Sequence, residues 1–430
     1  MATLKTVTLG CKVNQYETEY VRQALVGIGY RDAAEGETAD LCIVNTCTVT
    51  VEGDSKSRQT IRQLARRHPG TRIVVMGCYA TRAPEEVAAL PAVTEVVTDK
   101  RELSDLLGRY GVMDVPSGIS EFGTRHRAYV KVQDGCMLRC SFCIIPTVRP
   151  VLASRPPDEI VAEVRRLVER GYREVVLTGI HLGHYGVEWN RGRHKSQWVR
   201  LANLVERLAR LDGPFRIRLS SIEATEVTRE LIDVLAAHQE RVCPHLHVSL
   251  QSGSDAVLAR MRRRWGVRRF VDRCQMVRER LKQPAFTTDV IVGFPGETEA
   301  DFQATCRACE EVGFSKIHIF PFSARKSTSA ADLPDQVAPS IKADRARRLA
   351  ELEQRLRDEY FRSLVGRPLV VLVEGESKER PGWMVGTSCR YAPVALTGNA
   401  EMAGHFATIT AEEVDRGVIV GAAISASRAH

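Results

Sequence analysis

Three closely spaced cysteines, Cys136, Cys140 and Cys143, are the residues of this sequence best suited to metal chemistry. We call them the Cys136 triplet. They follow a strand-like apolar run, so one loop at a strand end would carry all three thiols. A structural zinc site closes with four ligands, and no fourth ligand lies nearby in the sequence. Thiolates also suit a 4Fe–4S cluster, in which three cysteines would leave one iron open to a substrate. Buried or zinc-binding cysteines are the alternative.

A second set of cysteines lies in the N-terminal part of the chain. Cys11, Cys47 and Cys78, here the Cys11 triplet, each follow an apolar run typical of a strand. The carboxyl ends of parallel strands share one edge of a sheet, so these side chains can converge on a second metal site. The alternative is that they are buried apolar residues. Cys42 lies inside its strand and is expected in the core.

The composition limits the class of protein. A chain of 430 residues predicts two or three domains, because a single core stops growing before that length. The twelve cysteines accompany no export-type leader and no apolar run of membrane length, so we expect reduced thiols and a cytoplasmic protein. Cys306 and Cys309 have CxxC spacing but fall in an apparent helix, where ordinary thiols are expected. The net charge of +8 is a mild indication of a polyanionic partner.

The hydrophobic pattern predicts an α/β fold in three parts. Residues 1–114 alternate apolar runs with amphipathic segments, which is typical of a parallel α/β domain, and a linker is expected at residues 115–124. Residues 125–340 predict a partial (β/α)6 barrel with its chemistry at the carboxyl ends of the strands. A bridging helix is expected at residues 341–364 and a small all-β barrel at residues 365–428. The six strand candidates of the central part are residues 128–132, 174–178, 215–219, 245–250, 287–292 and 316–320.

The chain resembles the radical S-adenosylmethionine (SAM) methylthiotransferase family over almost its whole length. The CxxxCxxC spacing is similar to that of radical SAM enzymes, and the Cys11 triplet resembles the other cysteines of the methylthiotransferases. The closing segment resembles their RNA-binding, TRAM-like β-barrel. The form GCKVNQYE is most similar to the branch that modifies threonylcarbamoyladenosine beside the anticodon of tRNA. The matching motifs are GCKVNQYE (10–17), VNTC (44–47), VMGC (75–78), CIIP (143–146), LTG (177–179), HVSLQSGSD (247–255) and GFPGE (293–297).

This resemblance implies a transferase that makes the 2-methylthio derivative of that nucleoside. It implies one 4Fe–4S cluster on the Cys136 triplet, with SAM on its open iron, and an auxiliary 4Fe–4S cluster on the Cys11 triplet. Reductive cleavage of SAM would give methionine and a 5′-deoxyadenosyl radical, and a second SAM would methylate the sulfur to be transferred. The expected partners are the tRNA anticodon stem-loop and a reductant such as flavodoxin or ferredoxin. We expect a monomer with no membrane attachment.

Five further residues are candidates for contact with SAM, and no catalytic side chain is expected besides the cluster ligands. Phe142 could pack on the adenine, and Gly179 lies where the backbone would approach the methionine end. Glu223, Gln251 and Asp289 lie near strand ends and could hydrogen-bond the amine, ribose or adenine. Each of these polar residues could equally be a structural cap or a satisfied loop group.

Two features depart from the family pattern. Arg149 is followed by Pro150, where the family usually has glycine, and proline restricts the backbone, so a local change of the loop path is expected. The C-terminal segment is not basic. The densest positive run, seven arginines between Arg260 and Arg273, is expected in one helical stretch of the central part. It is either a solvated helix face or a patch that contacts phosphates.

Other functions fit parts of the sequence. The same chemistry could act on isopentenyladenosine of tRNA or on an aspartate of a ribosomal protein. A non-catalytic iron–sulfur protein that binds RNA or transfers electrons would hold clusters without cleaving SAM. A structural zinc protein is a further alternative.

Overall fold

The computed structural model describes residues 1–123 and 126–426. The last residue of the expected linker, Thr124, and the last two residues of the expected C-terminal barrel, 427–428, lie outside the described residues. Within them, no helix is both long enough and apolar enough to cross a membrane.

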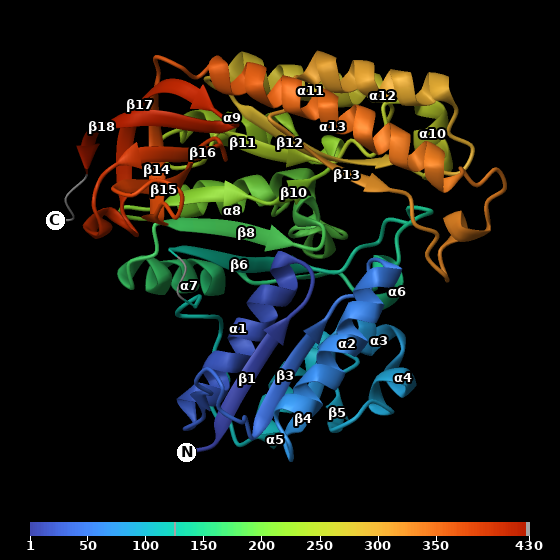
Figure 1. Cartoon of the computed structure of the whole chain (residues 1–430), viewed down its shortest axis with the longest axis vertical. Helices are drawn as coiled ribbons and strands as arrows, with labels where there is room; N and C mark the ends of the chain where they lie inside the picture. The colour runs from blue at the N-terminus through green and yellow to red at the C-terminus, as the bar shows by residue number, and fades with distance from the viewer. Residues whose placement is uncertain (124–125, 427–430) are drawn as a thin grey trace.

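The N-terminal part is a five-stranded parallel sheet with the strand order β2-β1-β3-β4-β5. Strands β3 and β4 are buried over almost their whole length because helices pack on both faces of the sheet (Figure 1). The predicted parallel α/β architecture is confirmed, and Cys42 is buried within β3, as expected. The strands are β1 (Thr3–Thr8), β2 (Arg31–Asp32), β3 (Leu41–Thr46), β4 (Arg72–Gly77) and β5 (Val93–Val96). The helices are α1 (Lys12–Gly27), α2 (Val51–Arg67), α3 (Cys78–Arg82), α4 (Pro84–Ala88) and α5 (Leu103–Arg109).

The central part is an open half-barrel built from two sheets, with the orders β7-β6-β8-β9 and β10-β11-β12-β13. A single parallel bridge between Ile217 and Val242 joins them. All six predicted strands are present, as β6 (Arg127–Asp134), β8 (Glu174–Gly179), β9 (Arg216–Leu219), β11 (His245–Val248), β12 (Ala285–Val292) and β13 (Lys316–Pro321). Two short strands were not predicted, β7 (Ala153–Ser154) and β10 (Ser221–Ile222). The helices are α6 (Ile145–Val148), α7 (Pro157–Glu169), α8 (Leu201–Ala209), α9 (Arg229–Ala237), α10 (Asp255–Arg260), α11 (Val267–Arg280) and α12 (Glu299–Val312).

The arginine run of the central part does not lie in one helix, so that expectation is wrong. Helix α10 ends at Arg260, and α11 begins only at Val267. Between them Arg262 has a φ of 57°, a left-handed conformation that no helix contains. The chain therefore turns sharply within the run, and its arginines point in different directions.

The C-terminal part begins with the long helix α13 (Pro339–Arg362), which packs beside β13 and leads into a closed five-stranded barrel (Figure 1). The predicted small β-barrel is confirmed. Its core includes Leu369, Val371, Leu396 and Ile409, all buried. The barrel strands are β14 (Pro368–Glu376), β15 (Trp383–Ser388), β16 (Pro393–Thr397), β17 (Phe406–Asp415) and β18 (Val418–Ala426).

A buried carboxylate, Glu174, joins this barrel to the amino ends of the half-barrel strands. Arg127, Arg216 and Arg218 contact it at 2.8, 2.6 and 2.9 Å. Burial alone would raise the pKa of the Glu174 carboxyl, but the three guanidinium groups hold it well below its usual range. Arg216 and Arg218 also donate to backbone carbonyls of the barrel, including that of Val370 at 2.9 Å.

Candidate functional site

The Cys11 triplet lies at the carboxyl ends of β1, β3 and β4, which are neighbours in the sheet. Cys11 directly precedes α1, and Cys78 begins α3. Burial raises the pKa of the partly buried Cys47 thiol, and the nearby Cys78 adds to this shift, whereas Cys11 is exposed at the sheet edge. The parallel sheet thus brings together three cysteines that are far apart in the sequence, as the position of each after its strand predicts.

Gly10 makes this approach possible. Its φ is +99°, and a Cβ added there would lie 2.9 Å from Cβ and 3.0 Å from Sγ of Cys47. A side chain at this position would therefore combine backbone strain with a collision against a member of the triplet.

The Cys136 triplet lies on the loop that connects β6 to α6. The loop is closed by two backbone hydrogen bonds, from Cys136 to the carbonyl of Arg149 at 3.1 Å and from Cys143 to that of Cys140 at 3.1 Å. Burial, together with the other two thiols, raises the pKa of the Cys143 thiol to about 12. A cationic metal centre would reverse this shift, because it binds the deprotonated thiolate.

Two basic side chains contact the Cys136 triplet. Nδ1 of His181 lies 3.5 Å from Sγ of Cys136, and its Nε2 lies 2.6 Å from a carboxylate oxygen of Glu226. Arg263 donates to Sγ of Cys140 at 3.1 Å. Arg263 belongs to the arginine run, and its side chain is only 3% exposed, so it is not part of a solvated face. Both contacts place a hydrogen-bond donor or a positive charge next to a thiol, which favours thiolate ligands.

The spacing of the thiols suits a cluster better than a single ion. Among the described residues, two groups of three potential ligands have their ligand atoms within 4.8 Å of one another, and neither cysteine triplet is among them. One zinc ion, with Zn–S bonds of about 2.3 Å, would hold its thiolates about 3.8 Å apart. Both groups with ligand atoms within 4.8 Å of one another consist of histidine and carboxylate side chains. They are His181–His184–Glu226 and His247–Asp289–His318.

Two of the five residues predicted to contact SAM are apolar or small. Phe142 packs edge-on against Phe294, with ring centroids 6.4 Å apart, inside the loop of the Cys136 triplet. Gly179 ends β8, and a Cβ there would lie 2.9 Å from the side-chain oxygen of Gln133. The backbone of β8 is therefore closely packed against β6 at this point.

Two of the three polar candidates, Glu223 and Asp289, already have side-chain partners. Glu223 accepts hydrogen bonds from Arg263 and from Nε1 of Trp265, so it is connected through Arg263 to the cysteine loop. The backbone N–H of Gln251 donates to the backbone carbonyl of Asp289 at 2.8 Å, and Gln251 has a φ of 64°. Asp289 lies 3.2 Å from Nε2 of His247. The contacts of all five residues with SAM stay predictions.

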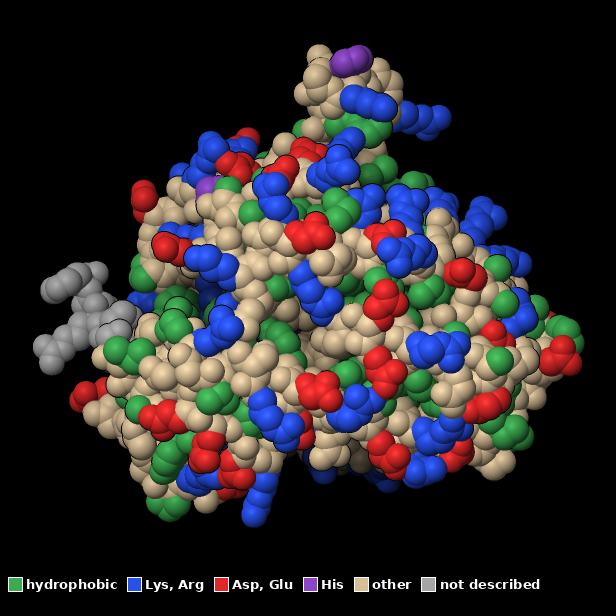
Figure 2. All heavy atoms as spheres, turned by 90° about the horizontal axis from the view of Figure 1, so that it is seen from above, with side chains coloured by type: hydrophobic (Ala, Val, Ile, Leu, Met, Phe, Trp, Pro, Cys, Tyr) green, Lys and Arg blue, Asp and Glu red, His purple; other side chains and the backbone are tan. Residues whose placement is uncertain are grey.

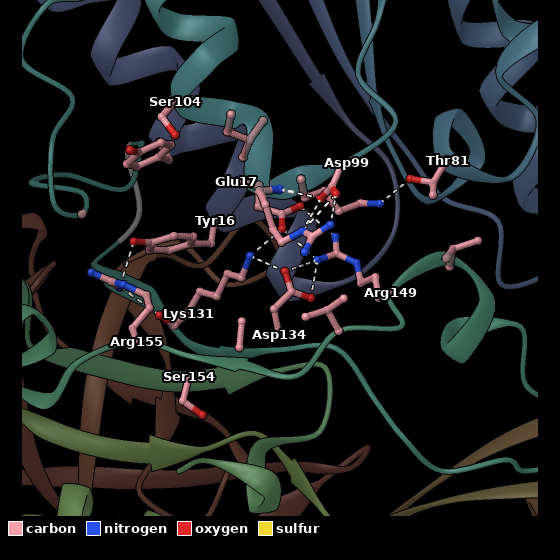
Figure 3. Close-up of a pocket in the computed structure, with 18 of the residues that line it drawn as sticks. Tyr16, Glu17, Thr81, Asp99, Ser104, Lys131, Asp134, Arg149, Ser154 and Arg155 are labelled. Atoms are coloured by element: carbon pink, nitrogen blue, oxygen red, sulfur yellow. Dashed lines mark hydrogen bonds and ion pairs between the residues drawn. The ribbon is translucent and has the colours of Figure 1, made fainter. Parts of the chain in front are cut away.

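Arg149 joins the two cysteine sites, and sequence reasoning missed this role. Its side chain is 1% exposed and donates to both oxygens of Glu17 at 2.8 Å, to Asp134 at 2.8 Å and to Asn14 at 3.0 Å. Its Nε also donates to Sγ of Cys78 at 3.4 Å. Figure 3 shows Arg149 between Glu17 of α1 and Asp134 of β6, beside a cavity of about 580 Å³. One side chain from the loop after the Cys136 triplet therefore contacts a member of the Cys11 triplet.

Apolar and ionic contacts continue this interface. Cys78 packs in one buried cluster with Ile144, which follows Cys143 directly, and with Val148 in α6. Arg325, from the segment after β13, is 2.7 Å from the buried carboxylate of Asp54 in α2. The segment after the Cys136 triplet thus contacts Cys78 of the Cys11 triplet through both charged and apolar groups.

Comparison with known proteins agrees with this geometry. The model of the Radical SAM superfamily matches residues 130–309, and that of the Uncharacterized protein family UPF0004 matches residues 3–99. Solved structures share the fold, among them the radical SAM methyltransferase TsrM from Kitasatospora setae, with a TM-score of 0.56 and 14% identity over 77% of each chain. The half-barrel and the cysteine loop together define a radical SAM enzyme. Enzymes of this class use an iron–sulfur cluster and SAM.

Proteins with similar sequences show which family within this class the chain belongs to. The threonylcarbamoyladenosine tRNA methylthiotransferase MtaB of Bacillus subtilis (strain 168) is 40% identical over 94% of this chain and 92% of its own. The protein of the same name in Chlamydia pneumoniae is 40% identical over 86% of this chain and 87% of its own. The tRNA-2-methylthio-N(6)-dimethylallyladenosine synthase of Mycolicibacterium smegmatis is 36% identical over 88% of this chain and 77% of its own. The chain belongs to the radical SAM methylthiotransferase family, which confirms the resemblance carried by its motifs.

Proposed function

We propose that this protein converts threonylcarbamoyladenosine beside the anticodon of tRNA into its 2-methylthio derivative. The observation that carries the proposal is the contact of Arg149 with Cys78, because it joins the segment after the Cys136 triplet to the Cys11 triplet. A transfer that needs a radical site and a separate sulfur-bearing site requires that arrangement. The relatives that carry the threonylcarbamoyladenosine name, at 36 to 40% identity, support the choice of substrate.

In this proposal each triplet binds one 4Fe–4S cluster, and SAM binds at the cluster of the Cys136 triplet. When bound, the clusters and SAM supply the electron, the radical and the sulfur that a change at an aromatic C–H position requires. The chain's own residues position these groups and exclude water. Arg263 and His181 direct N–H groups at two thiolates, and Arg149 does so at a third. A flavodoxin or ferredoxin remains the proposed reductant, and the enzyme is proposed to be a monomer.

The substrate is tested by product analysis. The reconstituted protein is incubated without oxygen with SAM, dithionite and tRNA that carries either threonylcarbamoyladenosine or isopentenyladenosine, and the nucleosides are identified by mass spectrometry. We expect the 2-methylthio product from the first tRNA and at least 100-fold less from the second. Product from the isopentenyl tRNA alone, or only on a ribosomal protein, would overturn the choice of substrate. A protein that binds its clusters but does not cleave SAM would overturn the proposal that it is an enzyme.

Replacing Gly10 with alanine is expected to remove the auxiliary cluster alone. The new Cβ would displace Cys47, so the iron content should fall from about eight to about four per chain, while 5′-deoxyadenosine is still formed. The matched control is Gly27→Ala at the end of α1, where a Cβ meets nothing within 4 Å. Iron counting and chromatography of the products check both. An unchanged iron content in Gly10→Ala would show that Cys47 does not need its present position.

A further inference from the structure

Six exposed cations lie on the cysteine loop and on two segments that contact it, and they have no ion-pair partner within residues 1–123 and 126–426. One lies in the cysteine loop itself, two lie on the turn between α10 and α11, and three lie at the tip of the connection from β8 to α8. We call them the basic rim. They are Arg139, Arg262, Arg264, Arg191, Arg193 and Lys195.

A hydrogen bond and a side-chain contact connect these three segments at their bases. The amide of Ser141, in the cysteine loop, donates to the carbonyl of Met261 at 3.1 Å, which ties that loop to the turn between α10 and α11. His181, at the root of the β8–α8 connection, lies 3.5 Å from Sγ of Cys136. Burial and the stacked His181 lower the pKa of His184 to about 4, and the charge of Arg264 adds to the shift. Arg264 therefore lies near the root of the same connection.

The β8–α8 connection, residues 180–200, is longer than most loops, and it is held in shape. The side chain of Asn190 makes two hydrogen bonds of 2.8 Å to the backbone of Val199. These bonds connect the two ends of the segment that forms the tip. Nε1 of Trp198 donates to the carbonyl of Arg193 at 3.0 Å. Tyr185 is fully buried beneath them. The three cations of the tip are thus presented by a preformed structure.

Several exposed cations elsewhere on the surface are paired with acids. On α13, for example, Arg347 pairs with Asp344 and Glu351, and Arg355 pairs with Glu310 and Glu359. Figure 2 shows positive and negative side chains interspersed over most of the face seen from above, whereas Lys, Arg and His side chains gather at the tip of a projecting lobe. Positive charges that repel one another without acidic partners favour binding of a polyanion.

We propose that the basic rim binds the phosphates of the tRNA anticodon stem-loop on either side of the target nucleotide. This inference rests on the proposed function, because the target base must reach the Cys136 triplet. A base in a single-stranded loop can be turned out toward that site while its flanking phosphates stay at the surface. The C-terminal barrel, in contrast, exposes Glu374, Glu376, Glu412 and Glu413. An acidic electron-transfer protein is the competing occupant of the rim.

The test compares two triple variants with equal loss of charge. The rim variant is Arg191→Gln/Arg193→Gln/Lys195→Gln. The control is Arg31→Gln/Arg347→Gln/Arg355→Gln, which removes three exposed cations that are paired with acids. Affinity for a fluorescent anticodon stem-loop RNA is measured by anisotropy at several salt concentrations, with iron content and thermal unfolding as checks of folding.

The rim variant is expected to bind the RNA about 10- to 100-fold more weakly at about 0.1 M salt, and the slope of log affinity against log salt should fall by about 2. The control should change affinity less than about twofold. Equal losses in both variants, or a loss without a change of slope, would overturn the proposal. Unchanged RNA binding with SAM cleavage lost under flavodoxin but kept under dithionite would assign the rim to the electron donor instead. A wild type that binds no RNA would overturn the proposed function itself.

Discussion

Changing all three cysteines of the Cys136 triplet to alanine is expected to abolish the formation of 5′-deoxyadenosine and to remove about half of the iron. The same change in the Cys11 triplet should remove the other half and leave SAM cleavage intact, but no methylthio product should form. The physical reason is that, in the proposed function, each set of thiolates would hold its own metal centre on its own sheet. Iron counting and product chromatography after anaerobic reconstitution measure both effects.

The matched control for these variants is Cys306→Ala/Cys309→Ala. These cysteines also have CxxC spacing, but they lie in helix α12, as predicted, and Cys309 is fully buried there. Their loss should leave the iron content unchanged. Loss of all iron from either triple variant would mean that the two sites are not independent.

Replacing Arg149 with methionine is expected to destabilise the metal-free protein by about 3–5 kcal/mol. The change leaves Glu17, which is 2% exposed, and the partly buried Asp134 with Lys131 as their remaining ion-pair partner. Urea unfolding measures the loss. Arg347→Met is the control, since its side chain is 61% exposed, and it should change stability by about 0.5 kcal/mol or less. The double variant Arg149→Met/Glu17→Gln should recover part of the loss, because it removes one of the unpaired charges.

The effect of Arg149 should depend on pH in a defined direction. Burial alone would raise the pKa of the Glu17 carboxyl, but Arg149 and Lys131 bring it down to about 2. The pKa in the unfolded chain is about 4.3, so the ionised network stabilises the fold fully above about pH 5 and less as the pH falls toward 2. The difference in unfolding free energy between wild type and Arg149→Met should shrink over the same range. A difference that does not depend on pH would contradict this account.

The architecture could be predicted because its signals are local. Each strand of the half-barrel is a short apolar run between turns, and the position of Cys11, Cys47 and Cys78 after three such runs is enough to place them at one sheet edge. The arginine run shows where local reasoning fails. Its helical pattern is interrupted at Arg262, whose left-handed backbone depends on the contacts of the turn and not on residue type.

The connection between the two sites could not be predicted. Arg149 and Glu17 are separated by 132 residues, and no periodic pattern relates them. The sequence drew attention to Arg149 only because Pro150 follows it. Arg263 likewise resembles its exposed neighbours in the sequence, and only the folded turn reveals that it contacts Cys140 and Glu223. Long-range ionic contacts follow from the packing of domains, which residue spacing does not encode.

The buried carboxylate Glu174 also has a consequence for the order in which the chain assembles. Translation proceeds from the N-terminus, and domains fold as they emerge from the ribosome. Arg216 and Arg218 can pair with Glu174 as soon as the half-barrel forms, but their carbonyl partners at Val370 and Ser388 are synthesised much later. The carboxylate of Glu174 is therefore paired before the hydrogen bonds of its arginines are complete. The barrel, which is synthesised after the half-barrel, then covers the amino ends of the half-barrel strands, at the end opposite the cysteine loops.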